Sequence, residues 1–441
     1  MSVVIFANYL NAAVTDRRYN NFMGSLFLHE FHHSLGARFA EVTTLRSVAK
    51  EDGNGAEVVN DYGDWLAEHS ALRKSAGVLD LSFRGRICLV GNDRVRFLHG
   101  QVTNDVKKLA VGSGCYAALT TARGKMVSDL NIFYLADELL LDFEPGLTWK
   151  ISQRLEKFIV ADDVQIVDAA QVYGLLSVQG PKAEDVIRAV GLFGVPPSGG
   201  SGSANPNRAN AELPAKPYDL LKISDTTLGE IYLMNHARLF CKLERRPPAR
   251  LDSNHENSQH AGPEAGAPSL GFDLFIPNSS LGAVADKLIA AAKQTRGRAC
   301  GWQAFETARI EAGIPRFGVD MDETNLPLEC GIESCAVSYS KGCYIGQEVI
   351  NRVHSFGHVT KELRGLRLAD DLKAPPVKGD KLFHHGKETG YVTSTVKSPA
   401  LNANIALGYV RREANQIGTE LVLQTVAGES SAKIVELPFV K

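Results

Sequence analysis

The spacing of apolar positions changes along the chain and predicts both helices and strands. Apolar residues in 24–39 recur close to helical spacing, which predicts an amphipathic helix. Residues 61–77 predict a second helix ending at Gly77, and residues 78–91 predict two short strands that are broken at Arg84 and Gly85. Further strands are expected at NIFYLA, ELLLDF and VYGLLSVQG, and further helices at 94–98, 148–160 and 181–191. The mixture is typical of an α+β fold.

Two regions depart from this alternation. Between Gly191 and Pro268 the chain is rich in Pro, Gly, Ser and Asn, which predicts two solvated insertions around a possible strand pair, LLKIS and IYLMNH. After residue 360, short strand-like runs follow one another, separated by glycines. Many short strands at regular spacing predict a small, closed or nearly closed β-barrel at the C-terminal end.

Composition excludes several classes of protein. The 441 residues exceed what one hydrophobic core usually serves, so we expect two or three domains. With 48 Lys and Arg against 50 Asp and Glu, the formal net charge is −2, and we expect no direct binding to nucleic acid. No apolar run reaches membrane-spanning length, the seven cysteines contain no CxxC pair, and the N-terminus has no basic segment before its apolar run. These features favour a cytoplasmic protein with reduced thiols and no membrane contact.

The segment KGCYIGQE, residues 341–348, is the most specific chemical signal. Glycines on both sides of Cys343 permit a tight turn that leaves the sulfur approachable, and the ammonium of Lys341 would favour the thiolate. Cys343 and Lys341 are therefore the candidate catalytic pair. The alternative is that Cys343 is a small buried hydrophobic residue that only shapes its loop.

This octapeptide resembles the signature of the YgfZ family, a folate-binding branch of the glycine-cleavage T-protein superfamily. The resemblance extends to residues 304–313 and 317–323, which are similar to R-x-E-A-G and G-x-D-x-D-E elements, and to matches at 80–82, 101–105, 175–181, 390–394 and 406–410. It covers most of residues 26–441 apart from the insertions. It implies two interlocked α+β domains around a central folate channel, followed by the barrel.

The resemblance gives domain boundaries and a ligand. We expect a loose N-terminus at 1–23, α+β regions at 24–190 and 269–358 separated by insertions at 191–268, and the barrel at 359–441. The implied ligand is tetrahydrofolate or a derivative. The folate-binding candidates are Asp129 for the pterin, Arg309 for the glutamate carboxylates, and Asp273 and Gln347. A structural ion pair is the alternative for Arg309.

Departures from the T-protein pattern influence the functional prediction. Ser128 replaces the first acid of an Asp pair ending at Asp129, the G-Y-T-G-E-D-G-x-E stretch is reduced to 269–273, and Leu141 to Glu144 replaces a Val-Asn contact. These departures favour the YgfZ branch over an aminomethyltransferase. The resemblance to that branch implies an accessory protein that supports assembly or repair of iron–sulfur enzymes, including some tRNA-modifying enzymes, with those enzymes or their assembly factors as partners. The alternative is an aminomethyltransferase that transfers a methylene group to tetrahydrofolate.

Metal sites are weakly indicated. Glu30, His32 and His33 lie in HEFHH, which lacks the His spacing of a zinc protease helix. Cys330, Cys335 and Cys343 match no strong cluster-ligand spacing. We predict no resident metal.

Overall fold

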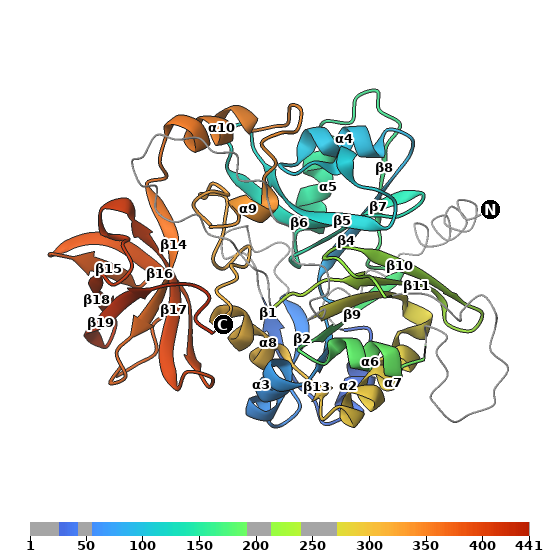
Figure 1. Ribbon diagram of the computed structural model, residues 1–441, viewed down its shortest axis with the longest axis horizontal. Helices are drawn as coiled ribbons and strands as arrows, with labels where there is room; N and C mark the ends of the chain where they lie inside the picture. The colour runs from blue at the N-terminus through green and yellow to red at the C-terminus, as the bar shows by residue number, and fades with distance from the viewer. Residues whose placement is uncertain (1–25, 43–54, 192–212, 240–270, 441) are drawn as a thin grey trace.

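The computed structural model describes residues 26–42, 55–191, 213–239 and 271–440 (Figure 1). Two α+β domains stand beside a C-terminal barrel, which confirms the expected fold class. The predicted loose N-terminus at 1–23 lies outside the described residues, as do most of the two insertions.

The first domain is built on a five-stranded antiparallel sheet in the order β5-β6-β7-β4-β8. Its strands are β4 (Gly85–Val90), β5 (Ser113–Thr120), β6 (Met126–Tyr134), β7 (Glu138–Phe143) and β8 (Gln165–Asp168). The helices α4 (Arg94–Gln101) and α5 (Thr148–Glu156) contribute Leu98, Ile151 and Leu155 to the core beneath it. The strands predicted at 131–136 and 138–143 are confirmed.

The second domain interlocks with the first because its sheet collects strands from distant parts of the chain. The order is β10-β11-β12-β9-β3-β13. The strands are β3 (Gly77–Asp80), β9 (Tyr173–Gln179), β10 (Leu220–Asp225), β11 (Gly229–Asn235), β12 (Gly271–Pro277) and β13 (Arg298–Ala299). The strand pair expected between the insertions is therefore confirmed, and it is part of this sheet. Helices α6 (Ala183–Ala189) and α7 (Leu281–Gln294) cover one face (Figure 1).

The barrel is closed, as the sequence predicts. It comprises β14 (Lys361–Leu368), β15 (Lys381–His384), β16 (Lys387–Ser398), β17 (Ala403–Arg411), β18 (Glu420–Thr425) and β19 (Gly428–Val435). One set of its apolar residues fills the barrel, whereas Leu363, Ile405, Leu407 and Tyr409 join the core of the first domain. The barrel is thus packed onto the rest of the protein through a shared apolar core.

The remaining helices connect these parts. The pair α3 (Trp65–Lys74) and α8 (Trp302–Glu311) lies beside the two-stranded sheet of β1 (Arg38–Val42) and β2 (Ala56–Asp61). The short α9 (Glu333–Ala336) precedes α10 (Gln347–Phe356), which runs between the first domain and the barrel (Figure 1). In the described part of the chain, no helix is long and apolar enough to cross a bilayer.

Two helix predictions need correction. The helix expected at 24–39 is limited to α2 (His29–Ser34), because Gly36 adopts a left-handed φ of 81° and the chain then enters β1. The helix expected to end at Gly77 stops at Lys74, and Gly77 begins β3 instead. A Cβ at Gly77 would lie 2.5 Å from Leu72 Cδ2 and 2.7 Å from Cys300 Sγ, so this glycine permits close packing and does not cap the helix.

Candidate functional site

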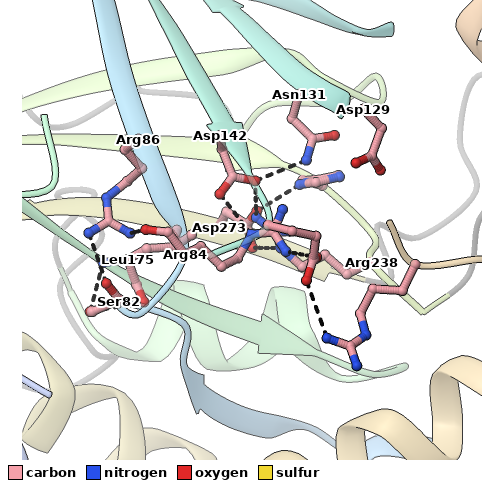
Figure 2. Close-up of polar contacts among 12 residues, drawn as sticks. Ser82, Arg84, Arg86, Asp129, Asn131, Asp142, Leu175, Arg238 and Asp273 are labelled. Carbon is pink, nitrogen blue, oxygen red and sulfur yellow. Dashed lines mark hydrogen bonds and ion pairs between the residues drawn. The ribbon is translucent and has the colours of Figure 1, made fainter. Parts of the chain in front are cut away.

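A polar network lies between the two large sheets and joins the two domains. Arg238 follows β11 and reaches both of them: its Nη2 is 2.9 Å from Asp142 Oδ2 on β7 and 2.7 Å from Asp273 Oδ2 on β12. Asn131 Nδ2 on β6 also donates to Asp142 Oδ2, at 2.9 Å. Figure 2 shows these side chains meeting between strands of both sheets.

A second arginine holds the opposite side of Asp142. Arg84, in the connection from β3 to β4, donates through Nε to Asp142 Oδ1 at 2.8 Å and forms an ion pair with Glu144. Burial alone would raise the pKa of Asp142, but the guanidinium groups of Arg84 and Arg238 outweigh it and keep the pKa below its ordinary value. Asp142 is therefore ionised and fixed, and it orients the surrounding donors.

Asp129 on β6 is the least satisfied carboxylate of the network. Tyr116 donates its hydroxyl hydrogen to Oδ2 at 2.8 Å, whereas Oδ1 is buried and has no hydrogen-bond partner. In Figure 2 the carboxylate lies beside Asn131. Burial raises the pKa of Asp129 to about 6, with the negative charge of Glu144 adding to the effect and Tyr116 and Arg84 opposing it. A buried acceptor with a pKa near neutrality is a typical functional group.

The network continues towards the barrel through Arg316. Its Nη1 lies 3.4 Å from Glu144 Oε2, its Nε lies 3.6 Å from Glu306 Oε2, and its guanidinium stands 4.9 Å from the ring centroid of Trp302. Trp302 and Glu306 also line a cleft of about 670 Å³ between α8, α3 and strand β16. Arg316 thus connects Glu144 of the network with an aromatic side chain and with a cleft of small-molecule size.

These groups fit a reduced folate. The free oxygen of Asp129 can accept a hydrogen bond from the amino or ring N–H groups of a pterin. Arg316 and Trp302 offer a cation and a flat aromatic surface to the rest of such a ligand. The donor and acceptor set therefore agrees with the tetrahydrofolate expected from the sequence.

Asp273 belongs to the same network but is fully occupied. It accepts a hydrogen bond from Arg238 Nε and lies 2.7 Å from His236 Nδ1. Burial would raise the pKa of Asp273, but Arg238 and His236 hold it below the ordinary value. Asp273 therefore supports Arg238, and a direct contact with folate stays a prediction.

Ser128 lies on the other face of β6. Successive strand residues point to opposite sides, and the Ser128 side chain is completely buried away from the network that contains Asp129. Moreover, Asp142 on the neighbouring strand supplies the carboxylate that orients Asn131 and Arg84. The substitutions at 128 and 141–144 therefore leave a complete polar network beside Asp129.

Arg309 lies elsewhere, at the contact between α8 and the barrel. It forms ion pairs with Glu306 and Asp320 at 2.6 and 2.7 Å and donates to Ser394 Oγ at 3.1 Å. Asp320 in turn accepts hydrogen bonds from Thr393 and Ser394 of β16. The guanidinium is thus engaged in joining α8 to the barrel, and its predicted contact with the folate carboxylates stays a prediction.

The 341–348 segment forms a third location, packed on α4 and the β5–β6 turn. Lys341 is buried, and its Nζ donates to the carbonyl oxygens of His99, Val102 and Asn104 at 2.6, 2.6 and 2.8 Å. Burial lowers the pKa of Lys341 to about 8. Lys341 therefore caps the carboxyl end of α4 by binding its free carbonyl oxygens. In sequence it lies two residues before Cys343.

Cys343 is exposed and free, as expected for an approachable thiol. The turn that carries it is fixed by Gly346, whose φ is 92° and whose missing Cβ would lie 2.6 Å from the carbonyl oxygen of Thr121. Gln347 is half-buried at the first position of α10. The catalytic role of Cys343 and Lys341 and the folate contact of Gln347 stay predictions.

The histidines near the N-terminus have structural partners. His32 Nε2 lies 2.9 Å from Asp80 Oδ2, and its Nδ1 lies 2.8 Å from the hydroxyl of Tyr62. No group of three potential metal ligands occurs within the residues that the structure describes.

Several network residues escaped the sequence analysis. Their roles depend on contacts between strands far apart in the chain, for which the sequence carries no local pattern. One signal was present: charged residues lie within or directly beside apolar strands, as Asp142 does in β7 and Arg84 does before β4, and buried charges need partners. The residues concerned are Arg84, Tyr116, Asn131, Asp142, Glu144, Arg238, Trp302 and Arg316.

Comparisons with known proteins place the fold. Residues 28–192 and 268–341 match the GCVT N-terminal domain, and residues 361–441 match the glycine cleavage T-protein C-terminal barrel domain. The crystal structure of glycine cleavage system aminomethyltransferase T from Bartonella henselae superposes with a TM-score of 0.73 at 21% identity, covering 94% of this chain and 97% of that one.

Curated relatives agree with the family. Aminomethyltransferases of Geobacillus sp. (strain WCH70) and Bacillus subtilis (strain 168) are each 26% identical over 397 residues. The alignments cover 88% of this chain and 95% and 94% of the two relatives. The aminomethyltransferase of Halalkalibacterium halodurans is 27% identical over the same length.

These findings contradict the predicted accessory role in iron–sulfur enzyme assembly or repair and support the aminomethyltransferase alternative. The prediction gave too much weight to Ser128 and to residues 141–144. Ser128 faces away from the network, and Asp142 strengthens it. Iron–sulfur partners have no support here.

The two family models together match most of the sequence, the N-terminal domain first and the barrel second. The fold agrees with that of the superposed aminomethyltransferase structure. This chain therefore belongs to the glycine-cleavage T-protein family.

Proposed function

We propose that this protein binds tetrahydrofolate between its two α+β domains and transfers a one-carbon group to it, as an aminomethyltransferase. The observation that carries the proposal is Asp129, a buried carboxylate with one unpartnered oxygen and a pKa of about 6. The names of the curated relatives support the reaction class.

Each residue of the network has a distinct task. Asp129 accepts a hydrogen bond from the ligand through Oδ1, while Tyr116 fixes the orientation of its other oxygen. Asp142 and Glu144 bind Arg84, which lies in the connection between β3 and β4. When bound, tetrahydrofolate supplies the nucleophilic nitrogens that accept the one-carbon group.

The pKa of Asp129 suits proton exchange near neutral pH. A carboxyl group with a pKa of about 6 is partly protonated at pH 6 to 7, so it can both accept and return a proton. Its fixed position on β6 also holds the ligand in one orientation, which contributes to the rate when reacting atoms must approach closely.

Within the family, we place the chain on the YgfZ-like branch because of its 341–348 segment, and we keep Cys343 as an accessible thiol, two residues after Lys341. This assignment is separate from the proposed reaction. A cytoplasmic location belongs to the same proposal, and the six described cysteines are free thiols.

The experiment measures binding and turnover in the purified full-length chain. At a tetrahydrofolate concentration 100-fold above the dissociation constant, binding should stabilise the fold by about 2.7 kcal/mol. With an aminomethyl-lipoyl carrier protein, the chain should release ammonia and form methylenetetrahydrofolate. Stabilisation without ammonia release would reject the transferase reaction but keep folate binding, and the absence of both would reject the whole proposal.

A further inference from the structure

A second cavity, of about 400 Å³, opens on the second domain. It lies between the end of α3, the start of α6 and the turn after α7, at the lower end of the molecule in Figure 1, whereas β5, β6 and α10 lie in the upper part. None of its residues belongs to the polar network around Asp129. The lining residues are Ala67, Ser70, Ala71, Lys74, Ser75, Lys182, Thr295, Arg296 and Arg298.

Positive charge dominates this cavity. Four lining residues are cationic, namely Lys74, Lys182, Arg296 and Arg298, and none is acidic. No ion pair joins any of the four to a carboxylate among the residues that the structure describes. The carboxyl ends of α3 and α7 each contribute about half a negative charge, and Glu68 of α3 interacts electrostatically with Arg298. The cavity keeps a net positive charge, which comes mainly from Lys74, Lys182 and Arg296.

Hydrogen bonds fix the backbone segments that carry the cations. The amide of Lys182 donates to the carbonyl oxygen of Ser75 at 2.8 Å, and the amide of Arg298 donates to that of Ala76 at 3.1 Å. Ser75 Oγ also donates to the carbonyl oxygen of Thr295 at 2.5 Å. Three chain segments that are far apart in the sequence are therefore tied together at the floor of the cavity.

Glycines make this close approach possible. A Cβ at Gly180 would lie 2.5 Å from the Ser75 carbonyl oxygen, and a Cβ at Gly297 would lie 2.2 Å from that of Ala76. Both distances are too short for any side chain. The backbone around the cavity is therefore preorganised, and it brings the attachment points of the four cations close together.

We propose that this cavity is a binding site for a small phosphate-bearing anion. Guanidinium groups bind phosphate oxygens through paired hydrogen bonds, and lysines add point charges. A volume of about 400 Å³ exceeds a bare phosphate and accommodates a ligand of nucleotide size. The site is independent of the proposed folate reaction, because it shares no residue with the network between the sheets.

Calorimetric titration of the full-length protein tests the site. Pyrophosphate and AMP are added separately at constant ionic strength, with sodium chloride as the reference salt. We expect saturable binding of one equivalent. The double variant Lys182→Gln/Arg296→Gln should weaken binding at least tenfold, whereas Lys433→Gln, an exposed lysine on the barrel, should leave it unchanged.

The two probes distinguish the sources of the phosphate. Equal affinities for the two probes would mean that the site recognises only the phosphate groups. Tenfold tighter binding of AMP would mean that the site also recognises the nucleoside. Lys182 and Arg296 are exposed, so the double variant should keep its unfolding temperature and its response to tetrahydrofolate. The proposal is overturned if neither probe binds saturably, or if the double variant binds as tightly as the unmodified chain.

Discussion

Asp129 should lower the stability of the ligand-free protein at neutral pH. Its pKa in the folded protein, about 6, exceeds the ordinary value of 3.8, so folding favours the protonated form. The stability that this preference contributes is complete below about pH 4 and is lost as the pH rises through about 6. At neutral pH the folded protein therefore bears the cost of a buried, ionised carboxylate.

Asp129→Asn should remove this cost and the folate response together. The amide oxygen can still accept the Tyr116 hydrogen bond, so we expect the ligand-free variant to gain roughly 1 to 3 kcal/mol of unfolding free energy at pH 7.5. At pH 4 the two proteins should be equally stable. Urea unfolding at both pH values measures this, and tetrahydrofolate should no longer stabilise the variant. An undiminished folate response would remove Asp129 from the site.

Cys343 should react before the other described thiols. It is exposed, whereas burial raises the pKa of Cys88 and Cys300 well above the ordinary value and that of Cys115 to about 12. Brief treatment of the native protein with iodoacetamide, followed by peptide mass spectrometry, should find the label at Cys343 first.

The matched control for this labelling is Cys343→Ser, which should remove the rapid phase. Rapid labelling of Cys88 or Cys300 in the native state would mean that the first or the second domain opens more readily than these buried positions indicate.

At the level of single residues, the sequence identified candidate residues whose position depends on the neighbouring residues in the chain. The glycines of the 341–348 segment predicted an exposed Cys343, and the resemblance to the Asp pair at 128–129 identified Asp129 as a candidate. Arg238 could not be found in this way. Its importance arises because it follows β11 and meets β7 and β12, and no local spacing relates these three segments.

The loop that carries Cys343 depends on one of its two glycines. At Gly346 the backbone is left-handed, and a Cβ would lie 2.6 Å from a backbone oxygen of the β5–β6 turn. At Gly342 the nearest atom to an added methyl group would be His99 Nε2, at 3.8 Å. The two positions therefore form a matched pair for substitution.

Gly346→Ala should lower the unfolding free energy by about 2 kcal/mol or more, because the left-handed conformation and the backbone contact add their costs. Gly342→Ala should change it by less than about 0.5 kcal/mol. Urea unfolding of both variants gives the comparison. Equal effects on the unfolding free energy would mean that the turn can move away from β5 without destabilising the protein.

Among the elements, strands were predicted better than helices. Apolar runs such as 138–143 are buried on both faces and read directly as β7. The periodicity at 24–39 was misleading, because Phe31 packs on the second domain while Gly36 turns the chain into β1. Tertiary pairing with β2 thus overrides the helical pattern after Ser34.

Buried ion pairs, together with the shared apolar core, join the parts of the whole molecule. Arg238 bridges the two sheets, and Arg309 joins α8 to Asp320 and Ser394 at the barrel. The sequence pattern predicted a mixed α+β region and the barrel, whereas the two interlocked domains were implied by the family resemblance. It could not predict how they are joined, because that depends on single charged residues inside apolar segments.

A substitution at Arg309 therefore distinguishes between two roles for this residue, attachment of the barrel to α8 and binding of the folate carboxylates. Arg309→Met leaves the buried Asp320 without its cation, whereas Glu306 keeps Arg316, and the loss should lower the unfolding free energy by about 3 to 5 kcal/mol. The exposed Arg367→Met on β14 is the control and should have little effect. Urea unfolding measures both variants.

The same variant decides the role of Arg309 in folate recognition. Stabilisation by tetrahydrofolate is compared with stabilisation by tetrahydropterin, which lacks the glutamate carboxylates. Because the donors of Arg309 already engage Glu306, Asp320 and Ser394, we expect the ratio of the two ligand affinities to be unchanged in Arg309→Met. If the variant instead kept its stability and lost only the advantage of tetrahydrofolate over tetrahydropterin, Arg309 would be a carboxylate-binding residue. The attachment of the barrel to α8 would then rest on the apolar contacts of Leu363, Ile405 and Leu407.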